Sequence, residues 1–541
     1  MMGKSIQRGI EFGLTAGSLM LLAALLNWHY QLGLTRYFDV DEFAHLSWAY
    51  QIFSGRRPYV DFLFFFPPGF HLFLMPLFAF GGGIAPILAA RVMAFIIFVA
   101  LVGVTILLFW LVRRSWTAIL VGAILAFLPI PFDKFLEIRP DTLAVLFAMT
   151  GMVCQTLVLQ GTSLQLRKEV PWSLIAGICY GMSLLILPKT IPQVGVAVIV
   201  EALRAIRFPE LKKFQFRESF NGLWNLLIGI FLPLVLFVLW TLTLGNIDQV
   251  WYSLTKLGLE ANKISQSFIM MPDLFFYPNV TFYGAAGWNG GLVVNHAIWL
   301  VAIFVGIYRL VTPFLSVTPA HAGVQSKSKM TKKEVAAAGP PNKIWSEFLI
   351  AATFFTYVIF YVQIVPLKHT QYLIPIAVFI AFYAADAVDM LWRKTVELSK
   401  NHAHLLPTGV FFAVFILGSI RLMQVFISVN GPKRAWTNAE TVKQLTMLYK
   451  TIPTTEYILD LTGETLYYKH PYVVCCTPFG QSAPYLSRPL PSLIQALEKT
   501  KTKYIFEGGV KRVTTILPAD QAYITAHFLP SPTIGGLLIK K

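Results

Sequence analysis

Residues 39–76 read DVDEFAHLSWAYQIFSGRRPYVDFLFFFPPGFHLFLMP, an acidic cluster followed by aromatic residues and a pair of prolines. The stretch comes directly after a hydrophobic segment near residues 10–30, which is long enough to cross a bilayer. The carboxylates therefore lie where the chain leaves the membrane. Ionisable groups at that position suggest chemistry at the bilayer surface.

We predict a helix over residues 41–53 of this stretch. The spacing puts Asp41 and His45 on one face and apolar residues on the other, which is typical of an amphipathic helix in the membrane interface. The carboxylates then face a cavity and not lipid. Two alternatives stay open: Asp39 or Asp41 could only cap the helix, and Glu42 could only complement the dipole of its first turn.

The composition extends the membrane setting to the whole chain. Of 541 residues, 56% are hydrophobic and only 13% are charged, which is far more apolar than a soluble globular protein. We therefore predict a polytopic α-helical membrane protein. A span needs about 20 mostly apolar residues, and the sequence offers about eleven such segments, near 10–30, 87–112, 116–132, 141–160, 172–188, 190–206, 221–244, 292–312, 345–366, 371–391 and 407–427.

Basic residues gather in alternate loops, which the positive-inside rule places in the cytoplasm. They are Arg113, Arg114, Arg167, Lys168, Arg204, Arg207, Lys212, Lys213, Arg217, Lys327, Lys329, Lys332, Lys333, Arg393, Lys394 and Lys400. The net charge of +17 is thus mainly a topology signal. Nucleic acid is excluded as a partner, because no basic patch is interleaved with exposed aromatics in a soluble domain.

The opposite loops then lie outside, and they hold nearly all the unusual polar residues. We expect two domains: a transmembrane domain over 1–428, with its main outer loop at 32–86, and an extracytoplasmic α/β domain over 429–541. The cysteines indicate neither a metal site nor a disulfide framework, because Cys475 and Cys476 are adjacent and a bond between them would be strained.

Further ionisable residues lie at the outer ends of predicted spans. The run EIRPD at 137–141 places Arg139 and Asp141 at the mouth of one span, and Lys189 lies at the outer turn of a helical hairpin. The alternatives are a structural Arg139–Asp141 pair and a snorkelling lysine. Lys368 and His369 lie at another short outer turn. His71 and Arg91 are weaker candidates, which we expect not to be catalytic.

Acids from one loop and cations from others therefore converge on one membrane face. This combination suits the displacement of a phosphate leaving group. A carboxylate takes the proton from an attacking hydroxyl, while lysine, arginine or a divalent metal neutralises the departing phosphate.

With these residues in place, the sequence resembles a known family over roughly residues 10–390. It is similar to the GT-C superfamily of polyprenyl-phosphate-sugar-dependent glycosyltransferases, especially the bacterial RgtA/B/C/D-like group related to aminoarabinose and protein O-mannosyl transferases. The resemblance rests on Asp41-Glu42 with Ala44-His45, the GxxPYxDF run from Gly55 to Phe62, Pro67-Pro68, Arg91, EIRPD at 137–141, Lys189 and the turn from Lys368 to Pro375.

The resemblance implies a GT-C fold with about 11 transmembrane helices, outer-face juxtamembrane helices and a small outer α/β domain. It assigns catalysis to Asp41, Glu42 and Asp141, with Asp41 as the base. By the same resemblance, the donor phosphate is contacted by Lys189, Lys368, His369 and Arg139. The substrate is contacted by His45, Tyr59, Asp61 and Tyr372. The sequence departs from the family pattern at Phe65-Phe66 and Lys368-His369. The cofactor stays open, with Mg²⁺ or Mn²⁺ as an alternative to none.

The implied reaction transfers a sugar, with inversion, from a polyprenyl-phosphate donor to a hydroxyl of a cell-envelope glycan, lipid or protein. The expected place is the outer face of a bacterial plasma membrane, among membrane lipids. Aromatic residues of the outer loop at 245–291 could stack on sugar or form an interfacial belt, which is the reading we favour. Two other classes stay open: a transporter or flippase of lipid-linked saccharide, and a non-catalytic partner in envelope assembly.

Overall fold

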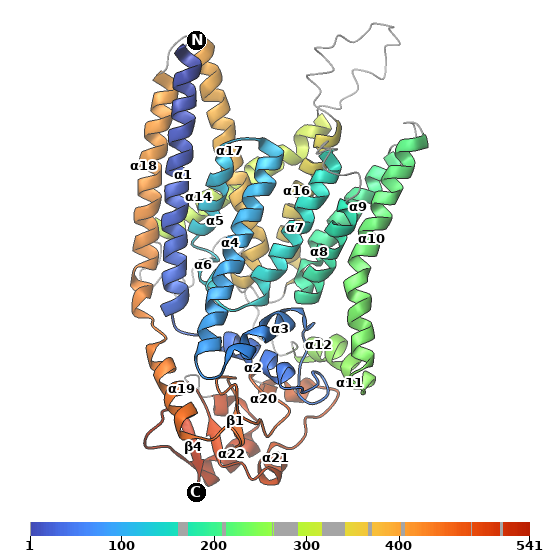
Figure 1. Cartoon of the computed structure of the whole chain (residues 1–541), viewed down its shortest axis with the longest axis vertical. Helices are drawn as coiled ribbons and strands as arrows, with labels where there is room; N and C mark the ends of the chain where they lie inside the picture. Colours follow the sequence, from blue (N-terminus) through green and yellow to red (C-terminus); the bar gives the residue numbers. More distant parts are fainter. Residues whose placement is uncertain are drawn as a thin grey trace.

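The computed structural model describes residues 2–160, 171–207, 213–261, 263, 290–315, 341–365, 370–401, 406–477, 479–508 and 512–541. Long helices form an elongated bundle, and a small domain covers one end of it (Figure 1). The bundle helices are α1 (Met2–Thr35), α4 (Ala85–Arg113), α5 (Thr117–Phe127), α7 (Pro140–Gln160), α8 (Trp172–Ile186), α9 (Ile191–Arg207), α10 (Lys213–Leu242), α14 (Gly290–Leu315), α16 (Pro341–Ile359), α17 (Ile374–Asn401) and α18 (Leu406–Asn430).

Each of the eleven segments predicted to span the membrane contains a helix, but a count of eleven spans is not confirmed. Eight helices in the described part of the chain are long and apolar enough to cross a membrane. The remaining three are α5, α8 and α9, with 11, 15 and 17 residues. At a rise of 1.5 Å per residue, α5 reaches only about 16 Å, roughly half the hydrocarbon thickness of a bilayer.

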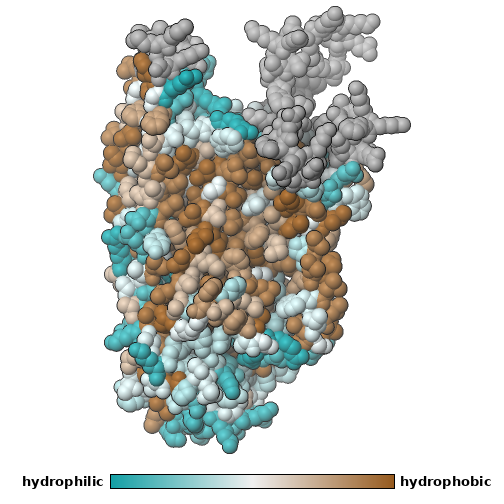
Figure 2. All heavy atoms as spheres, viewed as in Figure 1, coloured by the Kyte–Doolittle hydropathy of each residue, from teal (hydrophilic) through white to brown (hydrophobic). Residues whose placement is uncertain are grey.

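The surface of the bundle is apolar around its middle. Figure 2 shows a broad hydrophobic belt, with hydrophilic residues gathered over the small domain at one end. Large apolar side chains in this belt are exposed, such as Phe231 on α10 at 57%, Phe304 on α14 at 69% and Leu417 on α18 at 66%. Water disfavours apolar area of this extent, whereas lipid does not. The chain is therefore an integral membrane protein.

The small domain is built on a four-stranded sheet in the order β1-β2-β4-β3. Strands β1 (Ile458–Asp460) and β2 (Tyr504–Phe506) are parallel, whereas β4 (Leu537–Lys540) is antiparallel to β2 and to β3 (Phe528–Pro530). Its helices are α19 (Ala439–Thr451), α20 (Phe479–Ser482), α21 (Leu493–Lys499) and α22 (Pro518–His527). The sheet agrees with the α/β character predicted for the C-terminal part, while the boundary at residue 428 stays a prediction.

Short elements lie between the bundle and this small domain (Figure 1). They include α2 (Val40–Phe53), α3 (Gly69–Leu74), α6 (Phe132–Phe135), η2 (Pro188–Thr190), α11 (Ile247–Tyr252), α12 (Gly258–Ala261) and η6 (Thr370–Leu373). Polar contacts tie the small domain to the bundle. Among them, Lys433 Nζ lies 2.9 Å from Asp133 Oδ2, and Asn438 Nδ2 donates to the Leu34 carbonyl at 2.7 Å. The end of the bundle that carries these elements is called the site end below.

Helix α2 departs from the amphipathic interfacial helix predicted from sequence. It does begin and end close to the predicted bounds, but most of its side chains are buried around the whole circumference. Phe43 packs in one core cluster with Ile458 of the small domain, and Trp48 packs in another with Cys475. The sequence did not show this, because the covering domain lies some 400 positions away.

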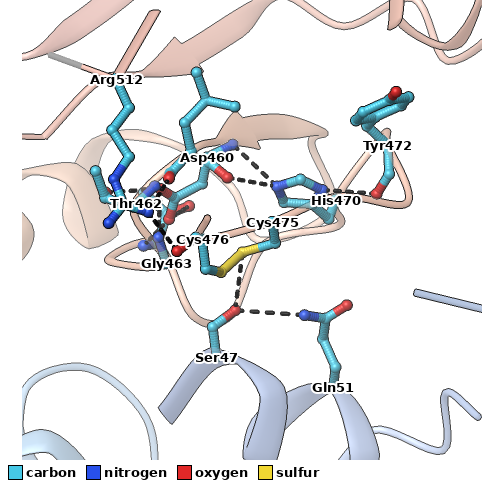
Figure 3. The surroundings of a disulfide bond; sticks show 12 residues. Ser47, Gln51, Asp460, Thr462, Gly463, His470, Tyr472, Cys475, Cys476 and Arg512 are labelled. Atoms are coloured by element: carbon cyan, nitrogen blue, oxygen red, sulfur yellow. Dashed lines mark hydrogen bonds between the residues drawn. A yellow bond between two sulfur atoms is a disulfide. The ribbon is translucent and has the colours of Figure 1, made fainter. Parts of the chain in front are cut away.

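The loop after β1 holds the small domain close to α2. Gly463 has φ +88°, and a Cβ atom there would lie only 2.8 Å from the Phe43 carbonyl oxygen. The Asp460 carboxylate fixes this loop by accepting from the backbone N–H groups of Thr462 and Gly463, both at 2.8 Å (Figure 3). Backbone therefore meets backbone at this interface.

The expectation of no disulfide is wrong for one pair of cysteines. Cys475 and Cys476 are bonded to each other, and both are buried against α2 (Figure 3). Ser47 Oγ of α2 lies 3.4 Å from Cys475 Sγ. Their adjacency argued against pairing in the sequence, which does not show that both side chains are enclosed beside α2.

Candidate active site

The first turn of α2 shows which acidic residue caps the helix. Asp39 Oδ1 accepts from the Asp41 N–H at 2.9 Å, and Glu42 Oε1 accepts from the Asp39 N–H at 2.8 Å, which completes a capping box. The capping alternative therefore applies to Asp39. Because this box already satisfies the helix start, the Asp41 carboxylate is available for other contacts.

Glu42 is fully buried and saturated with hydrogen bonds. It accepts from Arg91 Nη2 at 2.6 Å and from the Ile138 backbone N–H at 2.9 Å, and neither Glu42 nor Arg91 exposes its side chain. Arg91 also donates to the Gly33 carbonyl. Substrate cannot reach a carboxylate enclosed in this way. Glu42 therefore joins α2 to α4 and to the start of α7, and the geometry supports a positioning role for it.

Asp41 lies beside Glu42 but faces a different environment. Its Oδ2 accepts from Arg139 Nη2 at 2.9 Å, and the side chain is 49% exposed. Partial desolvation of its carboxylate raises the pKa of Asp41, but the charge and hydrogen bond of Arg139 and the charges of Lys134 and Arg512 lower it, and the net pKa lies below its ordinary value. Asp41 is therefore an ionised and accessible carboxylate at neutral pH.

Arg139, Asp141 and Lys189 extend the site along the mouth of the bundle. Arg139 Nε lies 3.9 Å from Asp141 Oδ2, and Lys189 Nζ lies 3.3 Å from Asp141 Oδ1. The ammonium group of Lys189 also lies 3.7 Å from the ring centroid of Tyr372. These four residues come from the start of α7, from η2 and from η6. The predicted convergence of acids and cations therefore occurs, with Lys189 paired instead of snorkelling.

Ten side chains at the site end form one continuous network of ion pairs. The carboxylates are Asp39, Asp41, Asp133, Glu137 and Asp141, and the cations are Arg36, Lys134, Arg139, Lys189 and Lys433. Buried charges persist only when they are paired in this way.

Two members of this network differ from the others in how far solvent reaches them. Asp41 is the most exposed carboxylate; the next is Asp39, at 23%, which already caps α2. Among the cations, Lys189 is 31% exposed, whereas no other exceeds 14%. The network thus offers a reacting group one carboxylate and one ammonium.

His45, predicted to contact substrate, pairs instead with His71. His45 Nδ1 lies 3.1 Å from His71 Nε2, and both residues are buried among aromatic rings. Burial, together with the charges of Arg139 and Lys189, lowers the pKa of His45 to about 3. Burial and the neighbouring His45 also hold the pKa of His71 well below its ordinary value. Both imidazoles are therefore neutral at physiological pH.

Tyr59 and Asp61 make local contacts apart from the ion-pair network. Tyr59 is 2% exposed and donates its hydroxyl to the Phe66 carbonyl at 2.7 Å, which braces the aromatic run before the prolines. Asp61 pairs with Arg57 at 2.9 Å within the same turn. Lys368 and His369 lie outside the described residues, as do the loop aromatics Phe275, Phe276, Tyr277, Tyr283 and Trp288.

Arg512 of the small domain is a site residue that the sequence did not indicate. It is 9% exposed, its Nη1 donates to the Leu461 carbonyl at 3.3 Å, and the same nitrogen donates to the Cys476 carbonyl (Figure 3). Its charge lowers the pKa of Asp41. No local pattern marks a single arginine in a long tail, so only the fold reveals it.

Several hollows lie near the charged residues, and two of them bear on the site. A small cavity of about 20 Å³ is bordered by Asp141, Lys189, Tyr357 and Tyr372. A wider groove of about 500 Å³ runs between α3, α7, α8 and α10, and its lining is almost entirely apolar, including Leu72, Phe73, Phe147, Met182, Leu236 and Trp240. The groove also includes Leu143 and Ile186, which are close in sequence to Asp141 and Lys189.

The described residues do not fit a resident metal ion. No group of three His, Cys, Asp or Glu side chains among them is placed to hold one. The two acids nearest the opening, Asp41 and Asp141, are each directed at a cation. A divalent ion at either carboxylate would lie beside the positive charge of Arg139 or Lys189, which repels it.

An apolar helical bundle whose one end is covered by α2 and a small sheet defines the fold class: the chain has the GT-C fold of membrane glycosyltransferases, as predicted. The crystal structure of ArnT from Cupriavidus metallidurans bound to undecaprenyl phosphate matches 96% of this chain and 97% of its own, with a TM-score of 0.54 and 14% identity. Its apo state matches 97% and 98%, with a TM-score of 0.51 and 11% identity.

An archaeal protein has a comparable fold. The oligosaccharyltransferase AglB from Archaeoglobus fulgidus, in complex with an inhibitory peptide and a dolichol-phosphate, matches 97% of this chain and 74% of its own, with a TM-score of 0.50 and 12% identity. No protein-family model and no curated protein sequence matches the chain. At these identities the similarity shows the fold alone.

Proposed function

We propose that the protein is an inverting glycosyltransferase that takes a sugar from a polyprenyl-phosphate donor. The observation that carries the proposal is the pair of accessible groups in the network, the Asp41 carboxylate and the Lys189 ammonium, which Arg139 and Asp141 connect. One accessible base and one accessible cation are the groups that displacement of a phosphate requires.

Each step of the proposed reaction uses one of these groups. The acceptor hydroxyl oxygen attacks the anomeric carbon while the bond from that carbon to the phosphate oxygen breaks. Asp41 takes the hydroxyl proton, and its lowered pKa keeps it ionised for this purpose. Lys189 neutralises the polyprenyl phosphate that leaves, and Asp141 holds the ammonium in place. A single displacement inverts the anomeric centre.

The apolar groove supports a lipid-linked donor. An isoprenoid chain needs a lining without polar groups, and the groove between α3, α7, α8 and α10 provides one close to Lys189. The neighbours ArnT and AglB are described with undecaprenyl phosphate and dolichol-phosphate. In this proposal the polyprenyl tail lies in the groove and its phosphate reaches Lys189, while the acceptor is an envelope glycan, lipid or protein.

The same proposal places the site on the outer face of a bacterial plasma membrane. Arg113 ends α4 at the end of the bundle far from the small domain, in agreement with basic loops on the cytoplasmic side. Nucleotide sugars are cytoplasmic, so an outward-facing transferase needs a donor carried by lipid. The side chains of the site favour transfer without a metal ion, because Lys189 and Arg139 supply the positive charge.

The test is sugar transfer in membranes that carry the wild type or Asp41→Asn. A panel of radiolabelled polyprenyl-phosphate sugars serves as donors, with and without EDTA. We expect one donor to be consumed by the wild type, little transfer by the variant, and no effect of the chelator. Inactivity with every donor, or an equally active variant, would refute the assignment. Saccharide movement across the bilayer without transfer would favour a transporter instead.

A further inference from the structure

Another hollow lies on the other side of α2, away from Asp41. It is a cleft of about 810 Å³ between the C-terminal end of α2 and the small domain. Tyr50 of α2 lines it, nine residues after Asp41, and nine residues are two and a half helical turns. Tyr50 therefore lies on the opposite face of α2, about 13 Å further along the axis. The cleft is separate from the proposed catalytic residues.

The lining of this cleft is rich in tyrosine. Five of its fourteen lining residues are tyrosines: Tyr50, Tyr449, Tyr457, Tyr467 and Tyr468. The rings pack against one another: Tyr50 and Tyr467 meet edge to face with centroids 5.0 Å apart, and Tyr449 and Tyr468 are stacked. Flat rings at the wall of a wet cleft are suited to the C–H faces of sugar rings, which are apolar on one side and polar at the edge.

Hydrogen bonds hold several of these rings in place before any ligand arrives. The Tyr467 hydroxyl donates to the Gly83 carbonyl at 2.9 Å, and the Tyr468 hydroxyl lies 2.9 Å from the Ile452 carbonyl. Gly82 and Gly83 also line the cleft, where an added Cβ meets no atom within 4 Å. The walls are fixed and the space is open, so binding requires little ordering of the protein.

The charges of the cleft have one sign. Arg56 and Lys469 line it, and no carboxylate is among its lining residues. Burial lowers the pKa of His470, whose Nδ1 lies 2.9 Å from the Tyr472 carbonyl, so this histidine is neutral (Figure 3). Lys469 is exposed, and its ammonium lies 5.8 Å from the Tyr457 ring centroid. A positive cleft without acids selects for an anionic ligand.

We propose that this cleft binds an anionic carbohydrate, with the sugar rings against its tyrosines and a carboxylate or phosphate against Arg56 and Lys469. Within the proposed function, on which this role depends, the carbohydrate is a part of the acceptor distant from the reacting hydroxyl. The cleft then defines the acceptor class as an acidic glycan or glycolipid, and it holds the acceptor while its reacting hydroxyl lies at Asp41.

The test measures binding and does not depend on transfer. Cellobiose and cellobiouronic acid differ only in one carboxylate, and saturation-transfer NMR reports their binding to the purified full-length protein in nanodiscs. We expect cellobiouronic acid to bind about tenfold more tightly, because only its carboxylate can accept charge-assisted hydrogen bonds from Arg56 and Lys469. Equal affinity of the two sugars, or binding of neither, would overturn the proposal.

Variants show whether the binding belongs to this cleft. Lys469→Ala should weaken cellobiouronic acid about tenfold and leave cellobiose unchanged, whereas Tyr457→Ala should weaken both about three- to tenfold. Lys499→Ala is the control, an exposed lysine of α21 that does not line the cleft. If neither Lys469→Ala nor Tyr457→Ala changes the affinity, the sugars do not bind in this cleft.

A third variant separates this proposal from the proposed function. Asp41→Asn should bind cellobiouronic acid like the wild type, because Asp41 does not line the cleft. If transfer from every donor fails while this binding persists, only the glycosyltransferase proposal is lost. If transfer occurs but cellobiouronic acid does not bind, only the role of the cleft is lost.

Discussion

The two ends of the helical bundle both contain buried ion networks, but they differ in access. At the end far from the small domain, Arg113 and Arg309 both pair with Asp386, and Arg113 also pairs with Glu347. No carboxylate of this opposite-end cluster, which also includes Asp389, exposes more than 11% of its side chain. At the site end, Asp41 exposes 49%.

This difference teaches that a buried ion network does not by itself mark an active site. Both networks satisfy charges that are costly to bury, and both join helices that are far apart in sequence. Only the site end leaves a carboxylate and a cation within reach of a substrate, next to an apolar groove. The predictions below test whether accessibility is what separates catalytic from structural charges.

The largest contrast is expected between Asp41→Asn and Asp386→Asn. Loss of a general base should lower kcat about 10²- to 10⁴-fold, with little effect on folding. Asp386→Asn should instead destabilise the protein by about 3–5 kcal/mol, because the buried Arg113 loses one of its two carboxylate partners and Arg309 loses its ion pair with Asp386. Transfer rates and thermal unfolding in detergent measure the two effects. If the two variants lose transfer activity and thermal stability to the same extent, accessibility does not separate catalytic from structural charges.

Part of this picture could be predicted from the sequence. The outer-end positions of Asp141 and Lys189 follow from where apolar segments begin and end, so their convergence could be expected. The Asp39 cap is a local pattern. By contrast, Glu42 could not be separated from Asp41 by sequence, because what encloses it is Arg91, 49 positions away. Arg512 and the cleft depend on how the small domain covers α2, which no local pattern encodes.

The second prediction concerns the accessible cation. Lys189→Ala should raise the KM for the donor about 10- to 100-fold, since a hydrogen bond to a charged group is worth about 1.5–3 kcal/mol. Lys189→Arg should recover part of the loss, because the charge is retained. The control is Lys394→Ala, which removes an exposed lysine that pairs with Glu397 on α17. A donor KM that is unchanged in Lys189→Ala would remove Lys189 from the donor site.

The third prediction concerns the attachment of the small domain to α2. Gly463→Ala should destabilise this contact by about 1–3 kcal/mol, because φ is +88° and the added Cβ meets the Phe43 carbonyl at 2.8 Å. Gly55→Ala is the matched control: φ is +86°, but no atom lies within 4 Å of the added Cβ. Hydrogen exchange of α19 and α2 should rise only in Gly463→Ala. An equal rise in hydrogen exchange in both variants would show that backbone strain at positive φ causes the effect, and not the contact with Phe43.

The last prediction concerns the pH dependence of the histidine pair, and its effect should be strongest at the site end. His45 and His71 stay neutral when folded, with the pKa of His45 at about 3, whereas an unfolded histidine takes up a proton below about pH 6.5. The unfolded state then binds more protons, so stability falls as the pH drops from about 6.5 toward 3. Each histidine contributes about 1.4 kcal/mol per pH unit in this window.

Hydrogen exchange at pH 7.0 and 5.5 locates the effect. Protection of α2 and α3 should fall at the lower pH, while the opposite-end cluster, whose described charged groups are Arg, Asp and Glu, should keep its protection. His45→Gln removes one of the histidines that titrate on unfolding, so it should reduce the loss of stability between these pH values by about 1 kcal/mol. If protection falls equally at both ends of the bundle, carboxylates cause the effect and the histidine pair does not.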